Sequence, residues 1–113
     1  MSESPLNAVV LVVDDTPDTL ALLHDALVES GYTVLVADNG ESALKISLDA
    51  TPDIVLLDAL MPGMDGFEVC RHLKHDLNTR HIPVIFMTGL TESEHVVAGF
   101  SAGGIDYVTK PLS

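Results

Sequence analysis

Short apolar runs alternate with amphipathic stretches along the chain. The runs are rich in Val and Ile, and most are apolar at consecutive positions. This pattern is typical of strands in a parallel sheet that is covered on both faces. Five strands are predicted, at residues 8–13, 33–37, 54–57, 82–87 and 105–108.

The stretches between these runs carry signals for helix starts. Thr16 precedes Pro17, and Pro is favoured at the first position of a helix. Asp38 and Asp65 each stand three residues before a Glu, which is the pattern of a capping box. Gly31 predicts the end of the first helix. Helices are therefore predicted near residues 17–30, 40–49, 65–76 and 92–102.

The alternation of predicted strands and helices sets the fold class. A β-α-β-α-β-α-β-α-β order with right-handed crossovers predicts an α/β fold with a doubly wound parallel sheet. A chain of 113 residues fits one domain, which we assign to residues 1–113. Ligands of such sheets bind at the carboxyl ends of the strands.

Charge and composition exclude several classes of function. Five Lys and Arg stand against seventeen Asp and Glu, for a net charge of −12. Nucleic acids and anionic membranes would be repelled, so a cation or a basic partner is expected. No apolar run approaches the ~20 residues that span a bilayer. Cys70 is the only cysteine, which excludes an internal disulfide and favours the cytoplasm. We expect Cys70 to be an inert core residue.

Polar residues whose side chains can bind ions or take part in a reaction gather at the predicted strand ends. They are Asp14, Asp15, Asp58, Thr88, Tyr107 and Lys110. Because the ends of parallel strands meet at one edge, three carboxylates, a hydroxyl and an ammonium group are expected to converge there. A cluster of carboxylates recruits a hard, oxygen-preferring cation such as Mg²⁺. One Asp could then act as a nucleophile that forms an acyl phosphate.

The chain resembles the receiver domain of bacterial two-component response regulators in five motifs. They are Val-Val-Asp-Asp at 12–15, Pro-Asp-Ile-Val-Leu-Leu-Asp at 52–58, Met-Pro-Gly-Met-Asp-Gly at 61–66, Pro-Val-Ile-Phe-Met-Thr at 83–88 and Asp-Tyr-Val-Thr-Lys-Pro at 106–111. The resemblance covers nearly the whole chain. It implies a flavodoxin-like fold with five parallel strands in the order 2-1-3-4-5.

The resemblance also implies roles for the acidic residues. Asp58 would accept a phosphoryl group in a Mg²⁺-dependent reaction, for which Mn²⁺ can substitute. Asp15 would bind the metal directly and Asp14 largely through water. Asp58 and the backbone carbonyl of Leu60 would complete the protein ligands.

The remaining implied roles concern binding of the phosphoryl group and the switch. Lys110 would bind the phosphoryl group, and Thr88 would follow it on activation. Tyr107 would be the aromatic residue that rotates in the switch. The surface around helix 4 and strand 5 would then change, and a homodimer could form through it.

The partners implied by the resemblance are proteins. A histidine kinase or a phosphotransfer protein would donate the phosphoryl group, and a covalent output domain or a protein partner would receive the signal. The chain would promote its own phosphorylation and dephosphorylation only, so we do not expect an enzyme in the strict sense.

Three alternatives stay open at this point. An aspartyl-phosphate phosphatase of the haloacid dehalogenase type would need a second Asp two residues after the nucleophile, where this chain has Leu60. A flavodoxin-like cofactor binder would need a phosphate loop where this chain has Asp14 and Asp15. A degenerate receiver would act only by binding partners. His72 and His75 have helical i, i+3 spacing, but no third ligand for a transition metal is evident.

The end of the chain carries a further expectation. Receivers that this chain resembles continue beyond the Lys-Pro motif into a fifth helix, which covers one face of the sheet. Here the chain ends at Ser113, so the fifth helix is apparently absent. We expect apolar strand surface to be left uncovered, either because the chain is a fragment or because another chain covers it.

Overall fold

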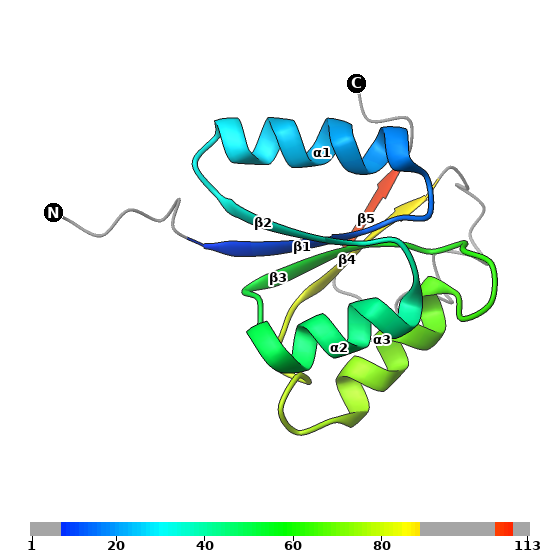
Figure 1. Ribbon diagram of the computed structural model, residues 1–113. Helices are drawn as coiled ribbons and strands as arrows, with labels where there is room; N and C mark the ends of the chain where they lie inside the picture. Colours follow the sequence, from blue (N-terminus) through cyan, green and yellow to red (C-terminus); the bar gives the residue numbers. More distant parts are fainter. Residues whose placement is uncertain (1–7, 89–105, 110–113) are drawn as a thin grey trace, which may run out of the picture.

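Five parallel strands form one sheet in the computed structural model, which describes residues 8–88 and 106–109 (Figure 1). The strand order is β2-β1-β3-β4-β5, as predicted. The strands are β1 (Val9–Val13), β2 (Thr33–Ala37), β3 (Ile54–Asp58), β4 (Val84–Thr88) and β5 (Asp106–Thr109). The helices are α1 (Pro17–Glu29), α2 (Gly40–Ala50) and α3 (Gly66–His75). The predicted doubly wound fold is therefore confirmed, and the predicted helix at 92–102 lies outside the described residues.

Helices cover both faces of the sheet, with α1 on one face and α2 and α3 on the other (Figure 1). Successive strand side chains point to opposite faces. Leu11 and Val13 of β1 accordingly belong to the core beneath α2 and α3, whereas Val10 and Val12 belong to the core beneath α1. A strand with two buried faces needs apolar residues at consecutive positions, which explains the unbroken apolar runs of the sequence.

Helix starts follow the sequence signals with one correction. Thr16 is the N-cap of α1 and precedes Pro17, although its side chain makes no capping hydrogen bond. The Asp65 carboxylate accepts a hydrogen bond of 2.9 Å from the backbone N–H of Glu68 and caps α3. The prediction that Asp38 caps the second helix is wrong. Asn39 is the N-cap, because its side chain lies three residues before Ser42 and accepts the Ser42 N–H at 2.8 Å.

Element ends differ from the prediction by a few residues. Gly31 adopts a φ of 100° just after α1, which agrees with its predicted role in ending that helix. β4 begins at Val84 and not at Ile82, because Ile82 closes a turn by donating its N–H to the carbonyl of Thr79 at 3.0 Å. Pro83 follows and has no N–H for the sheet ladder.

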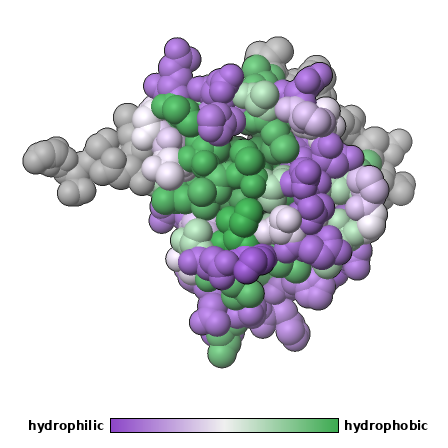
Figure 2. Space-filling model, viewed as in Figure 1, coloured by the Kyte–Doolittle hydropathy of each residue, from purple (hydrophilic) through white to green (hydrophobic). Residues whose placement is uncertain are grey.

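The two faces of the sheet are closed to different degrees. Beneath α2 and α3 the core is fully buried and includes Phe86, whose ring packs against Phe67 with centroids 5.2 Å apart. Apolar side chains gather in the middle of the view in Figure 2, over the sheet between α1 and α2. On the face of α1, a hollow of about 160 Å³ is lined by Val10, Leu27, Tyr32, Ile54 and Leu56.

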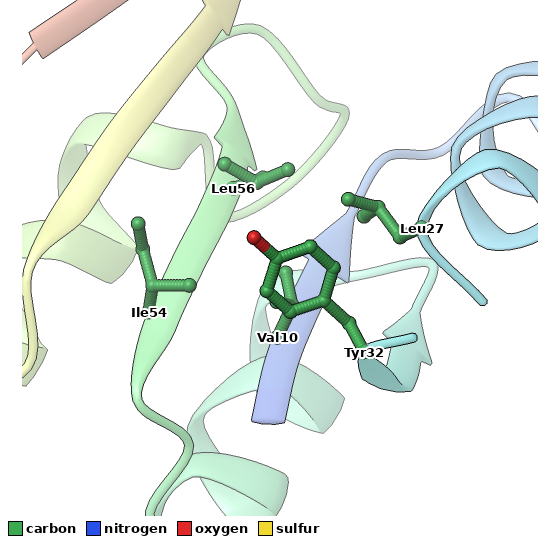
Figure 3. Close-up of a pocket in the computed structure, with 5 residues that line it drawn as sticks. All are labelled: Val10, Leu27, Tyr32, Ile54 and Leu56. Atoms are coloured by element: carbon green, nitrogen blue, oxygen red, sulfur yellow. The ribbon is translucent and has the colours of Figure 1, made fainter. Parts of the chain in front are cut away.

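The hollow has side chains from three elements and one loop around it. Leu27 reaches it from α1, Val10 from β1, and Ile54 and Leu56 from β3, while the ring of Tyr32 lies across its centre (Figure 3). It lies on the face where the resemblance to receivers implies a fifth helix. That a further helix or another chain covers this face stays a prediction.

Candidate functional site

The carboxyl ends of four strands meet at one edge of the sheet. In the register of the ladders, Val13 is level with Leu57, Asp58 with Met87, and Thr88 with Thr109. The residue after Val13 is Asp14. Residues from distant parts of the sequence therefore end at one edge, as the strand pattern predicted.

Three carboxylates lie together at this edge. Carboxylate oxygens of Asp14, Asp15 and Asp58 are all within 4.8 Å of one another. Asp14 and Asp58 are buried, with 0% and 4% of their surface exposed, and Asp15 is exposed to solvent. Like charges at this separation repel one another, which a bound cation would relieve. An all-oxygen set of this kind fits a hard divalent cation such as Mg²⁺ or Mn²⁺.

Local backbone contacts position the two buried carboxylates. The Asp14 Oδ1 atom accepts a hydrogen bond of 2.8 Å from the N–H of Thr16, which starts α1. The Asp14 N–H donates to the carbonyl of Ala37 at 3.1 Å and ties the residue to β2. The Asp58 Oδ1 atom accepts the N–H of Leu60 at 3.2 Å. Both carboxylates are thus held by the chain that immediately follows their strands.

The start of α3 presses against the backbone of Asp58. The N–H of Gly66 donates to the carbonyl of Ala59 at 3.0 Å. A Cβ atom at position 66 would overlap the carbonyl oxygen of Asp58 and lie 2.8 Å from the Cα of Ala59. Only glycine allows this approach. The strand end that carries Asp58 is therefore fixed by a close contact with the first residue of a helix.

The other predicted site residues are described to different extents. Thr88 is the last residue of β4, and Tyr107 lies in β5 level with Phe86. For Thr88 and Tyr107, these are positions of the backbone in the sheet. Leu60 follows the Asp58 strand end, and 47% of its surface is exposed. Lys110 lies outside the described residues.

The candidate residues of α3 take no part in this cluster. Cys70 is completely buried, and burial raises the pKa of its thiol from 9.0 to about 11, although the charges of Lys74 and Arg71 act in the opposite direction. The thiol therefore stays protonated, which agrees with the inert role predicted for it. Within the described part of the chain, the cluster of Asp14, Asp15 and Asp58 is the group of three or more potential metal ligands, and His72 and His75 are not part of one.

Sequence reasoning missed two supporting residues of the site. Gly66 stands in the motif at residues 61–66, but the sequence does not reveal its close approach to Asp58. Ala37 was not considered, although its carbonyl binds the Asp14 N–H. The proximity of Gly66 to Asp58 has no local sequence signal, because it depends on how α3 packs against the end of β3.

Comparison with known proteins was made by sequence and by structure. The family model described as "Response regulator receiver domain" matches residues 10–113. The response regulator PleD of Caulobacter vibrioides is 45% identical over 107 residues, which are 95% of this chain and 24% of that protein. A protein of Vibrio cholerae named "Probable cyclic di-GMP phosphodiesterase" is 44% identical over 104 residues, or 92% of this chain and 23% of that protein. The chain thus spans about a quarter of the length of these relatives.

The fold also matches solved structures. The chemotaxis protein CheY4 of Vibrio cholerae superimposes with a TM-score of 0.91 at 29% sequence identity. The match covers 95% of this chain and 89% of that chain. Among the residues described here, no helix has the length and apolar character needed to cross a membrane.

Proposed function

Because the chain belongs to the response regulator receiver domain family, we propose that it is a phosphorylation-dependent signalling switch with Asp58 as the phosphoacceptor. The single observation that carries the proposal is the cluster of three carboxylates within 4.8 Å at the carboxyl edge of the sheet. Asp58 is the member that ends a central strand and is held there by the Leu60 N–H.

The proposed reaction is a transfer of a phosphoryl group between two proteins. A carboxylate oxygen of Asp58 attacks the phosphorus of a phosphohistidine on a histidine kinase or a phosphotransfer protein. The phosphorus–nitrogen bond breaks, and an acyl phosphate forms on Asp58. The buried position of Asp58 keeps bulk water away from the attacking group, while its place at the strand end leaves it within reach of the donor.

A divalent cation is the proposed cofactor. Asp14, Asp15 and Asp58 would hold it together with the backbone carbonyl of Leu60, and the all-oxygen donor set fits Mg²⁺, with Mn²⁺ as a substitute. A cation held there would neutralise negative charge among the carboxylates and the phosphoryl oxygens. Asp15, which is exposed, would be the ligand that the metal reaches from solvent.

Lys110, Thr88 and Tyr107 have the proposed roles of reading out the phosphorylation. The Lys110 ammonium would pair with a phosphoryl oxygen, and the Thr88 hydroxyl would donate a hydrogen bond to another. Tyr107 would change rotamer as Thr88 moves, because the two residues lie on neighbouring strands. Phosphorylation would then shift a two-state equilibrium at the surface of β5 and the predicted helix before it, through which a homodimer could also form.

The output is proposed to lie outside this domain. The relatives PleD and the V. cholerae phosphodiesterase are about four times as long as the matched segment, which supports a covalent output domain or a separate protein partner. The phosphatase alternative is disfavoured because Leu60 offers no general acid two residues after Asp58. The proposed location is the cytoplasm, where phosphohistidine donors are available.

Labelling with a small phosphodonor tests the proposal. With acetyl phosphate and Mg²⁺, the intact mass should rise by one phosphate, and Asp58→Asn should abolish the increase. Asp49→Asn, which removes an exposed carboxylate of α2, is the matched control and should label like the unmodified chain. Labelling that survives in Asp58→Asn, or that proceeds without a divalent ion, would refute the assignment. A folded chain that takes no label at all would favour the degenerate receiver.

A further inference from the structure

The end of α3 and the turn that follows it carry a charge opposite to that of the rest of the chain. Residues 71–81 contain three of the five Lys and Arg, three of the five His and one of the seventeen acids. Counting Lys, Arg, Asp and Glu, this segment carries +2 and the remaining residues carry −14. The segment lies at the end of the molecule away from the loops that follow β1 and β3 (Figure 1). The turn that follows α3 is therefore remote from the carboxylate cluster, which adjoins the first residue of α3.

The turn is held by its own backbone. Asp76 is the C-cap of α3, and its carbonyl accepts the N–H groups of Thr79 and Arg80 at 3.1 and 2.9 Å. Its side chain accepts the N–H of Asn78 at 2.8 Å. The Ile82 N–H then closes the turn onto Thr79. These bonds define one conformation for the connection between α3 and β4.

Two polar side chains lock the turn to the rest of the fold. The buried Thr79 hydroxyl donates to the carbonyl of Leu73 in the last turn of α3 at 2.7 Å. The Lys74 ammonium donates to the carbonyl of Ile82 at 2.6 Å and to that of Arg80 at 3.3 Å. A surface on such a turn is already ordered before it binds, which lowers the entropic cost of binding.

Arg71 and Arg80 are left available for a partner. Both are exposed, and within residues 8–88 and 106–109 the ion pairs are His24–Asp25 and Lys45–Asp49, which involve neither arginine. In a chain with seventeen acids, two arginines outside any of these pairs are notable. Arg is also enriched among the residues that dominate protein interfaces.

An apolar anchor and a hollow accompany these arginines. Leu77 is 72% exposed, more than any other large hydrophobic residue that the structure describes as exposed. On α3, Glu68, Arg71, His72 and His75 line a hollow of about 250 Å³. Leu77 lies between Arg71 and Arg80 in the sequence, and the hydrogen-bonded turn holds its side chain in solvent.

We propose that this surface is a docking site for an acidic protein segment that carries an apolar side chain. We define it as the basic turn surface, made of Arg71, His72, His75, Leu77, Arg80 and His81. Carboxylates of the partner would pair with Arg71 and Arg80, and its apolar side chain would cover Leu77. A second copy of the chain is a poorer occupant, because a symmetric contact would bring two segments of charge +2 together. Because the surface is remote from Asp58, docking there would not require phosphorylation.

A titration followed residue by residue tests the proposal. The probe is a short synthetic peptide of Asp and Glu with two leucines, added to the ¹⁵N-labelled chain and followed by NMR chemical shifts. We expect shifts confined to residues 71–81 and their neighbours. The variant with Arg71→Glu and Arg80→Glu should weaken binding by about tenfold or more, and Leu77→Ser should weaken it by a smaller factor. Lys45→Glu, which reverses an exposed charge on α2, is the control and should leave binding unchanged.

Several outcomes would overturn the proposal. One is the absence of shifts at millimolar peptide, and another is an equal response to a peptide with Lys in place of Asp and Glu. A single-stranded DNA oligonucleotide that binds as tightly as the peptide would show that the surface attracts polyanions in general and is not specific for a protein segment. Shifts of the same residues on raising the concentration of the chain alone would assign the surface to a second copy. Unchanged spectra away from the surface will show that the variants are folded, since all the substituted side chains are exposed.

Discussion

The two ends of the molecule use buried polar groups in opposite ways. At the end with α3 and its turn, the Thr79 hydroxyl and the Lys74 ammonium each meet carbonyl groups that need a donor. At the carboxyl edge, Asp14 and Asp58 are buried beside each other and beside Asp15, so groups of the same charge are brought together. Complementary partners stabilise a fold, whereas clustered like charges store repulsion that a ligand can relieve. The buried contacts at the first end hold the turn in place, whereas the clustered acids at the second end support the proposed cation site.

The largest loss of stability is expected from Gly66→Ala, which disturbs the carboxyl edge without changing any charged residue. The added Cβ would overlap the Asp58 carbonyl, so α3 must move away or the end of β3 must shift. The free energy of unfolding should fall by about 2 kcal/mol or more, as for other overpacked sites. Urea denaturation measures this, and labelling by acetyl phosphate should fall as well. An unchanged midpoint and unchanged labelling would show that the close contact does not position Asp58.

The next effect concerns the repulsion among the carboxylates. Mg²⁺ at ten times its dissociation constant should stabilise the folded chain by about 1.4 kcal/mol, because it binds the folded state only. In a domain of this size that corresponds to a rise in melting temperature of about 5 °C. Asp15→Asn should leave the metal-free chain as stable or more stable and should reduce the response to Mg²⁺.

A matched carboxylate outside the cluster controls for the general effect of charge. Asp49→Asn should keep the full response to Mg²⁺, because Asp49 pairs with Lys45 on α2. A melting curve indifferent to millimolar Mg²⁺, or an Asp15→Asn variant that is clearly less stable without metal, would contradict the assignment of the cluster.

A smaller effect is expected at the opposite end. Thr79→Val removes the hydroxyl that donates to Leu73 and leaves that carbonyl without the bond. The free energy of unfolding should fall by about 1 kcal/mol, and the response to Mg²⁺ should not change. Thr79→Ser keeps the hydroxyl, so its free energy of unfolding should fall by less than that of Thr79→Val. Equal losses in both variants would indicate that the methyl group, and not the hydrogen bond, holds the turn.

The sequence predicted most of the fold because the central strands β1 and β3 are largely buried on both faces. Unbroken apolar runs such as residues 54–57 are interrupted only where the chain leaves the sheet, so the strand ends and the position of Asp58 could be inferred from local pattern. The cap of α2 was missed because Asp38 and Asn39 are both good capping residues, and the choice depends on which of them lies three residues before the first free N–H.

Contacts between distant residues could not be predicted in the same way. The lock between Thr79 and Leu73 and the contact of Gly66 with Asp58 depend on the packing of α3, for which the sequence has no local signal. Arg71 and Arg80 enter the sequence analysis only as part of the net charge, since their exposure follows from the fold. The expected convergence of the three acids was correct because it requires only the direction of the strands.

The central claim is that one carboxylate of the three, that of Asp58, carries the phosphoryl group. Borohydride reduces an acyl phosphate on Asp to homoserine, so reduction after treatment with acetyl phosphate and Mg²⁺ marks the modified residue for peptide mass spectrometry. Homoserine should appear at position 58, and only in samples that received both the donor and the metal. Homoserine at position 14 or 15, or its absence from a chain whose intact mass shows a bound phosphate, would contradict the claim.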